Sequence, residues 1–270
     1  MTHGGSDAAP DVPAHDAVGC VCGVGGGGPS PVTGLAAHVP DGAGGIHAWW
    51  ADGRGLTAEV VAELAATTLP PHERRRYDAV SDPLGRTEFV LARWVLRGAL
   101  GRVLGLPPDR VPLAVDGAGR PWTAGEPDVD VNVAHTAGLV AVAVGTGLAP
   151  GTRVGVDIEA IRPVPRADVL ARRLFSPAER ALLDAARGPA EDAAWLDIWT
   201  RREAYVKALG TGVLTLADAP EQGVGHAWHP LRLPCGFTGG LVVVPPAGRA
   251  GPPPFPHPFP LSSDAQGALP

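Results

Sequence analysis

The sequence predicts a mixed fold of helices and strands, made of two similar parts between two poorly structured ends. Two long segments have the apolar spacing of helices, and several short segments alternate as strands do. Each long helix carries a tryptophan and finishes in Ala-Leu-Gly, at residues 93–101 and 198–210. This weak echo suggests an internal duplication of about 100 residues.

The ends of the chain are where glycine and proline gather. Residues 1–45 lack an apolar period, and we expect a disordered N-terminal extension there. Residues 247–270, with the run G-P-P-P-F-P-H-P-F-P, are expected to form a disordered tail. We therefore place a first α/β half at residues 46–148 and a second at residues 149–246.

The elements of the first half follow from periodicity and from start and stop residues. Thr57 is a helix cap, and Gly105 ends the second helix of this half. The expected elements are a strand at 46–50, a helix at 57–68, a basic run at 72–76, a helix at 83–104, and strands at 128–135 and 139–144 with a turn at 136–138.

The second half is expected to hold strands and helices of the same kinds. The expected elements are a strand at 154–158, a helix opening at 176, a helix at 193–209, and strands at 226–233 and 240–244. Ser176, Pro177 and Glu179 have the pattern of a capping box. We therefore expect Glu179 to be structural.

Composition excludes some classes of function. The formal net charge of −6 argues against a nucleic-acid binder. The start of the chain lacks a signal-peptide pattern, and the longest apolar run, at 138–144, is too short to span a bilayer. Three cysteines, an odd number with one C-x-C, do not form a disulfide framework, so we expect free thiols. These features predict a cytoplasmic protein. We also expect it to be a monomer.

The segment V-G-V-D-I-E offers a pair of carboxylates. Asp157 and Glu159 share one face of a strand, opposite Val154, Val156 and Ile158. Carboxylates about 7 Å apart can ligate one hard cation, and magnesium suits such a site because it keeps waters and takes phosphate oxygens. The alternative is a pair of solvated acids on an outer face.

The segment W-T-R-R-E-A-Y-V-K places Glu203 and Lys207 one turn apart on one helix face. An ordinary surface pair is the simple interpretation. However, Lys207 is the only lysine of the chain, and arginine serves at every other basic position. Arginine cannot give up its proton at useful pH. Composition therefore favours a chemical role for Lys207.

Five segments follow one another in an order that resembles the Sfp-type 4'-phosphopantetheinyl transferases, across residues 46–244. They are G-R-P-W (119–122), N-V-A-H-T (132–136), V-G-V-D-I-E (154–159), F-S-P-A-E (175–179) and W-T-R-R-E-A-Y-V-K (199–207). The resemblance implies an α+β fold in which two similar α/β halves form an intramolecular pseudo-dimer, with the active site between them.

The resemblance also implies roles for individual residues. Asp157, Glu159 and Glu203 would bind Mg²⁺, and Glu203 and Lys207 would be catalytic. Contacts to coenzyme A would come from Arg86, His135, Thr136 and a basic residue such as Arg76. A structural role for a lone histidine such as His135 remains an alternative. The sequence departs from the family pattern at Arg202, usually lysine, and at Thr136, usually serine.

The activity implied is transfer of 4'-phosphopantetheine from coenzyme A to a serine of an acyl or peptidyl carrier protein. The resemblance implies carriers of polyketide or nonribosomal peptide synthases, with a fatty-acid carrier as the alternative. Two alternatives remain open: a magnesium-dependent phosphohydrolase acting on coenzyme A-like pyrophosphates, and a non-catalytic binder of coenzyme A or carrier domains. Neither nucleic acid nor a membrane is expected as a partner.

Overall fold

Strands with buried apolar side chains form the central layers of this chain. The computed structural model describes residues 32–41, 44–117, 119–186, 188, 190–220 and 225–246. The elements are β1 (Val32–Asp41), β2 (Gly44–Asp52), α1 (Ala58–Thr68), α2 (Pro71–Asp78), α3 (Pro83–Leu104), η1 (Pro108–Arg110), β3 (Leu113–Val115), β4 (Pro121–Thr123), β5 (Asp130–Thr136), β6 (Leu139–Thr146), β7 (Arg153–Ala160), α4 (Ala167–Leu174), α5 (Pro177–Ala185), α6 (Glu191–Leu209), η2 (Val213–Asp218), β8 (Ala227–Pro230) and β9 (Phe237–Val244).

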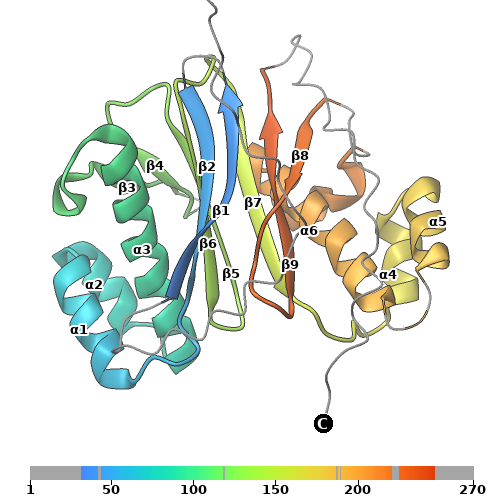
Figure 1. Cartoon of the computed structure of the whole chain (residues 1–270), viewed down its shortest axis with the longest axis horizontal. Helices are drawn as coiled ribbons and strands as arrows, with labels where there is room; N and C mark the ends of the chain where they lie inside the picture. The colour runs from blue at the N-terminus through green and yellow to red at the C-terminus, as the bar shows by residue number, and fades with distance from the viewer. Residues whose placement is uncertain are drawn as a thin grey trace, which may run out of the picture.

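Two antiparallel sheets stand side by side in the middle of the molecule. One has the strand order β1-β2-β6-β5 and the other has the order β7-β9-β8, while β3 and β4 form a separate small pair. Helices α1, α2 and α3 lie outside the first sheet, and α4, α5 and α6 lie outside the second (Figure 1). The expected mixed helix-and-sheet fold is therefore confirmed.

The strands of the central layers are buried on both faces. One face of β2, β6, β7 and β9 meets the other sheet, and this inter-sheet core includes Ile46, Ala141, Val156 and Leu241. The opposite faces pack against helices: β6 against α3, and β9 against α6. The alternation expected at 154–158 is thus observed, with the valines and the isoleucine directed into the inter-sheet core.

Helix α6 approaches β7 closely because Gly155 has no side chain. A Cβ atom there would fall 1.9 Å from the carbonyl oxygen of Ala204 and 2.8 Å from the amide nitrogen of Ala208. Asp157 is two residues further along the same face of β7, so the close approach brings it next to the helix. The turn between β5 and β6 uses Ala137 and Gly138, both with positive φ, as expected for a tight hairpin.

The N-terminal boundary at residue 45 is corrected by β1, which occupies Val32–Asp41 and pairs with β2. This strand lies at the edge of its sheet, where proline such as Pro40 is tolerated, so its composition resembles that of a loop. The tails expected at 1–31 and 247–270 lie outside the described residues.

Other elements also differ from the sequence expectations. The segment α4 and the small pair β3–β4 were not expected, and β8 is shorter than the strand expected at 226–233. Cys235 is disulfide-bonded, so the expectation of free thiols is wrong for this residue. Within the described ranges, no helix is both long and apolar enough to cross a membrane.

Candidate active site

A cavity of about 630 Å³ lies between residues of the first sheet and its helices on one side and helix α6, which packs on the second sheet, on the other. Its lining includes Arg76 from α2, His135 from β5, and Glu203 and Lys207 from α6. We call it the bridging cavity. Four of the predicted site residues, from segments separated by more than a hundred residues, therefore face one space.

Lys207 reaches across from α6 to β7. Its Nζ donates a hydrogen bond to Oδ1 of Asp157 at 2.5 Å, and the lysine side chain is one-third exposed while Asp157 is buried. The surface-pair interpretation predicted Glu203, one turn earlier on the same helix, as the partner. The sole lysine is instead ion-paired with one of the predicted metal ligands.

Burial raises the pKa of Asp157 to about 7; Lys207 opposes this shift, and Glu203 and Glu159 add to it. Burial also raises the pKa of Glu203, again opposed by Lys207 and reinforced by Glu159. The three predicted metal ligands therefore influence one another. Repulsion among them is relieved when a cation lies nearby, because positive charge favours the ionised carboxylates.

Glu159 is the least buried of the three and has two partners of its own. Its Oε2 accepts hydrogen bonds from Thr136 at 3.2 Å and from Arg162 at 3.1 Å. Thr136 thus contacts a predicted metal ligand from the neighbouring sheet. The family serine position is occupied here by a hydroxyl that joins β5 to β7.

The donor set suits a hard divalent cation in kind. Oδ2 of Asp157 is buried and has no hydrogen-bond partner among the described residues. Carboxylate oxygens are the ligands that Mg²⁺ prefers. In this structure the Lys207 ammonium group pairs with Asp157, and the Arg162 guanidinium pairs with Glu159. Across the described residues, no three His, Cys, Asp or Glu side chains are arranged so that they could hold a metal ion.

His135 is held by a carboxylate that the sequence did not reveal. Its Nδ1 lies 2.8 Å from Oε2 of Glu88, while Oε1 of Glu88 accepts the backbone N–H of Gly138 at 2.8 Å. Burial acts to raise the pKa of Glu88, but the hydrogen bonds from His135 and Gly138 outweigh it and lower that pKa. The histidine is half-exposed. It is oriented from beneath and open toward the cavity.

The arginines near this end of the cavity differ in their surroundings. Arg86 donates its Nε–H to the carbonyl of Val80 at 2.6 Å, and its guanidinium lies 5.9 Å from the ring centre of Tyr77. Its neighbour Gly85 lines the cavity. Arg86 is therefore beside the cavity but is directed, in this structure, to its own loop.

A buried cluster of positive charge lies behind Arg76. Glu73 forms ion pairs with Arg93 and Arg97, each at 3.0 Å. Burial lowers the pKa of Arg93; Glu73 opposes the shift, and Arg76 and Arg97 add to it. Arg76 and Arg93 both line the cavity. Three arginines against Glu73 give this cluster a net positive charge, and Arg76 and Arg93 present it to the cavity, which favours an anionic ligand.

Arg202 has a structural role, which removes the question raised by its departure from the family pattern. It is buried and donates to Glu179 at 2.6 Å and to the carbonyls of Leu216 and Ala219. Glu179 also forms the expected capping box with Ser176. Its structural interpretation is thus correct, although the cap is only part of it.

The site residues that the sequence analysis missed are Glu88, Arg93 and Arg162. Glu88 and Arg93 lie on α3, where they were not separable from an ordinary polar helix face. One signal was present: Glu88, Arg93 and Arg97 interrupt a helix otherwise rich in buried apolar residues. Their partners lie far away in the chain, so spacing alone could not assign them.

Comparison with known proteins gives a consistent family. Residues 153–226, which include Asp157, Glu159, Glu203 and Lys207, match the ACPS family, described as the 4'-phosphopantetheinyl transferase superfamily. The chain is 31% identical over 156 residues to the 4'-phosphopantetheinyl transferase HetI of Nostoc sp., covering 57% of this chain and 64% of that protein.

Two further relatives carry the same description. The chain is 33% identical over 151 residues to the 4'-phosphopantetheinyl transferase AcpT of Escherichia coli, covering 56% of this chain and 70% of that protein. It is 26% identical over 156 residues to a 4'-phosphopantetheinyl transferase of Bacillus subtilis, covering 58% of this chain and 66% of that protein. The matches to the Nostoc and Bacillus proteins thus span less than two thirds of each.

Proposed function

Since this chain belongs to the 4'-phosphopantetheinyl transferase family, we propose that it transfers the 4'-phosphopantetheine group of coenzyme A to a serine of an acyl or peptidyl carrier protein. The products are the holo carrier and 3',5'-ADP. One observation supports the proposal: the bridging cavity is lined by the positively charged Arg76 and Arg93 and also by the pair Glu203 and Lys207.

The chemistry needs a base, a charge-stabilising group and a donor for the leaving group. Glu203 removes the proton from the carrier serine, directly or through a water. The serine oxygen then forms a bond to the β-phosphorus, and the bond from that phosphorus to the oxygen of 3',5'-ADP breaks. Lys207 stabilises or protonates this departing oxygen, where negative charge develops.

Asp157, Glu159 and Glu203 would hold Mg²⁺, which when bound neutralises charge on the pyrophosphate. Lys207 has a second task in this arrangement, because its ammonium group already neutralises Asp157. The buried aspartate is therefore never left as an isolated charge, which would be strongly unfavourable. The same lysine lies in the cavity, within reach of a bound phosphate.

Recognition of coenzyme A is assigned to the other wall. His135 and Arg86 contact the 3'-phosphate, with Arg76 close to the same phosphates and Thr136 beside them. What supports this is the half-exposed imidazole of His135, oriented by Glu88. Arg86 has to leave the carbonyl of Val80, or share its donors with it, to reach the phosphate.

The pseudo-dimer of two halves, at residues 46–148 and 149–246, is part of the same proposal. It is supported by a long helix on the outer face of each sheet, α3 on one and α6 on the other. We further propose that the protein acts as a monomer in the cytoplasm.

The direct test is the intact mass of an apo carrier protein incubated with this protein, coenzyme A and magnesium. The carrier should gain the mass of one phosphopantetheine group. Lys207→Arg should slow the reaction by about 100-fold, because arginine is too basic to donate a proton and too large for the space. Arg172→Lys, an exchange at an exposed ion pair with Asp168, is the matched control and should react at the wild-type rate.

The same experiment separates the alternatives. Cleavage of coenzyme A without any carrier would identify a phosphohydrolase. Binding of coenzyme A with no change in carrier or cofactor would identify a non-catalytic binder. Full turnover by Lys207→Arg would return Lys207 to a charge-pairing role with Asp157 alone.

A further inference from the structure

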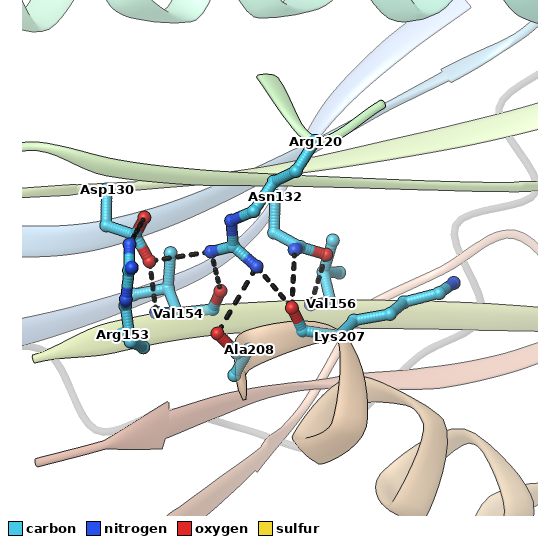
Figure 2. A network of polar contacts seen from close by, with 8 residues as sticks. All are labelled: Arg120, Asp130, Asn132, Arg153, Val154, Val156, Lys207 and Ala208. Atoms are coloured by element: carbon cyan, nitrogen blue, oxygen red, sulfur yellow. Dashed lines mark hydrogen bonds and ion pairs between the residues drawn. The ribbon is translucent and has the colours of Figure 1, made fainter. Parts of the chain in front are cut away.

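Arg120, in the G-R-P-W segment, is the hub of a network that joins both halves of the molecule. Its Nη2 donates to Oδ2 of Asp130 at 2.8 Å and to the carbonyl of Val154 at 3.0 Å. Its Nη1 donates to the carbonyl oxygen of Lys207 and, at 3.3 Å, to that of Ala208. Figure 2 shows the guanidinium between Asp130 and the end of α6, with the Lys207 side chain extending away from the cluster.

The end of α6 needs such a partner. The last four carbonyl groups of a helix receive no hydrogen bond from within the helix, and positive charge is favoured near them. The carbonyl of Val206 is satisfied by the amide of Gly210 at 2.9 Å. The next two carbonyls, of Lys207 and Ala208, are the ones that Arg120 contacts. The last turn of this helix is therefore capped by a side chain from the other half.

Lys207, whose carbonyl group Arg120 contacts, is also the residue whose ammonium group pairs with Asp157 in the site. The backbone of Lys207 is held by Arg120 and, at 3.5 Å, by Nδ2 of Asn132, while its ammonium group lies on Asp157. Asp130 in turn fixes the register of β7, because its Oδ2 accepts the backbone N–H of Val154 at 2.7 Å. Both β7, which carries Asp157, and α6, which carries Lys207, are thus tied to one guanidinium.

We propose that Arg120 is a positioning residue: by capping α6 and bonding to Asp130 and Val154, it fixes the location of the Lys207 ammonium group relative to Asp157. An arginine suits this task because its planar group presents several donors in fixed directions, whereas one ammonium group is a point charge. The consequence for turnover rests on the proposed function. The consequence for the environment of Lys207 does not.

The sole lysine makes this testable without any assay of activity. Labelling with a water-soluble succinimidyl ester modifies only Lys207 and the N-terminal amine, and cleavage at arginines separates the two. Arg120→Ala should increase the rate of Lys207 labelling by about tenfold, which corresponds to about 1.4 kcal/mol. The increase is expected because the ammonium group is no longer held against the buried carboxylate.

Arg153→Ala is the matched control. Arg153 also forms an ion pair with Asp130, at 3.2 Å, but its side chain is mostly exposed and no hydrogen bond from it to α6 occurs among the described residues. This variant should label at the wild-type rate. Equal acceleration in both variants would mean that Asp130, rather than the cap on α6, controls Lys207, and would overturn the proposal.

Kinetics of the transfer provide a second readout. Arg120→Ala should lower kcat by about tenfold and leave KM for coenzyme A within about twofold, since the lysine is misplaced but the opposite wall is intact. A raised KM with unchanged kcat would instead make Arg120 a direct contact of coenzyme A. If no transfer occurs even in the wild type, the proposed function fails while the labelling result still decides the role of Arg120.

A purely structural role has its own signature. It would lower the urea midpoint of Arg120→Ala with native labelling unchanged, and that result would also overturn the proposal. If Arg120→Ala does not fold, Arg120→Gln, which retains one amide donor, is measured in the same way. Labelling of Lys207 at the wild-type rate in folded Arg120→Gln, which keeps too few donors for all the contacts, would contradict the proposal.

Discussion

At the scale of single residues, burial shifts the pKa of several ionisable side chains in the second half, and such shifts make stability depend on pH. His229 on β8 is an example outside the site. Burial lowers the pKa of His229 to about 4, because the charged imidazolium is poorly solvated there. The folded protein therefore holds this histidine neutral under conditions in which an unfolded chain takes up a proton.

The sign of the effect on stability follows from this difference. Between about pH 6.5 and about pH 4 the unfolded chain binds more protons at His229 than the folded protein does, so acid favours unfolding. The full contribution, about 3 kcal/mol, is present above pH 6.5 and is lost as the pH falls toward 4. His229→Gln should flatten the pH dependence of the urea unfolding midpoint across this window. An unchanged slope in the variant would contradict the assignment.

The pairing of Lys207 with Asp157 shows which features of single residues can be predicted from the sequence and which cannot. The composition pointed to Lys207 as a special residue, and the alternation pointed to the face that Asp157 shares with Glu159. Asp157 and Lys207, which are in contact, lie 50 positions apart in the chain. Glu88 and His135, which are also in contact, lie 47 positions apart. No local pattern encodes such pairs. They follow from the packing of α6 on β7 and of α3 beneath the hairpin of β5 and β6.

At the scale of elements, strongly periodic segments were predictable and weakly patterned ones were not. The strands at 139–144 and 154–158 and the helix at 83–104 occur where expected. The edge strand β1 was missed because pairing with β2, rather than its own composition, makes it a strand. The short α4 was missed because its N-cap residue, Arg166, makes no side-chain cap hydrogen bond and gives no start signal.

The contact between β7 and α6 gives a prediction at this scale. Gly155→Ala places a methyl group 1.9 Å from the carbonyl oxygen of Ala204, on a backbone that is packed from both sides. Helix and strand must separate, at a cost of about 1–3 kcal/mol for an overpacked site. The melting temperature should fall by about 3–10 °C, and Lys207 should move away from Asp157.

Gly98→Ala is the matched control for this substitution. Gly98 is exposed within α3, and no atom lies within 4 Å of its added methyl group. Alanine should stabilise this helix by about 0.5–1 kcal/mol, because it restricts the unfolded chain more than glycine does. Scanning calorimetry of both variants should therefore show shifts of opposite sign. A stable Gly155→Ala would show that α6 can be displaced without loss.

At the scale of the whole molecule, the two halves share one core and one polar seam. The inter-sheet core takes residues from β2 and β6 on one side and from β7 and β9 on the other. The seam joins β5 to β7: Asp130 and Asn132 use their side-chain oxygens to accept the backbone N–H groups of Val154 and Val156, at 2.7 and 3.1 Å. At the edge of β7, these side-chain oxygens accept the backbone hydrogen bonds that the carbonyl groups of a neighbouring strand would accept within a sheet.

We propose that the division at residues 148 and 149, between the two proposed halves, does not separate independent folding units. A separate 149–246 fragment would expose the apolar inner face of its sheet to water, and would lose the hydrogen bonds that Val154 and Val156 donate to Asp130 and Asn132, each worth about 0.5–1.5 kcal/mol. We predict that neither fragment, 32–148 or 149–246, is folded alone by circular dichroism. The whole chain should unfold in a single transition. Hydrogen exchange gives the sharpest check: the amides of Val154 and Val156 should exchange only with the free energy of global unfolding, and faster exchange at these two positions would show that the seam opens independently of the shared core.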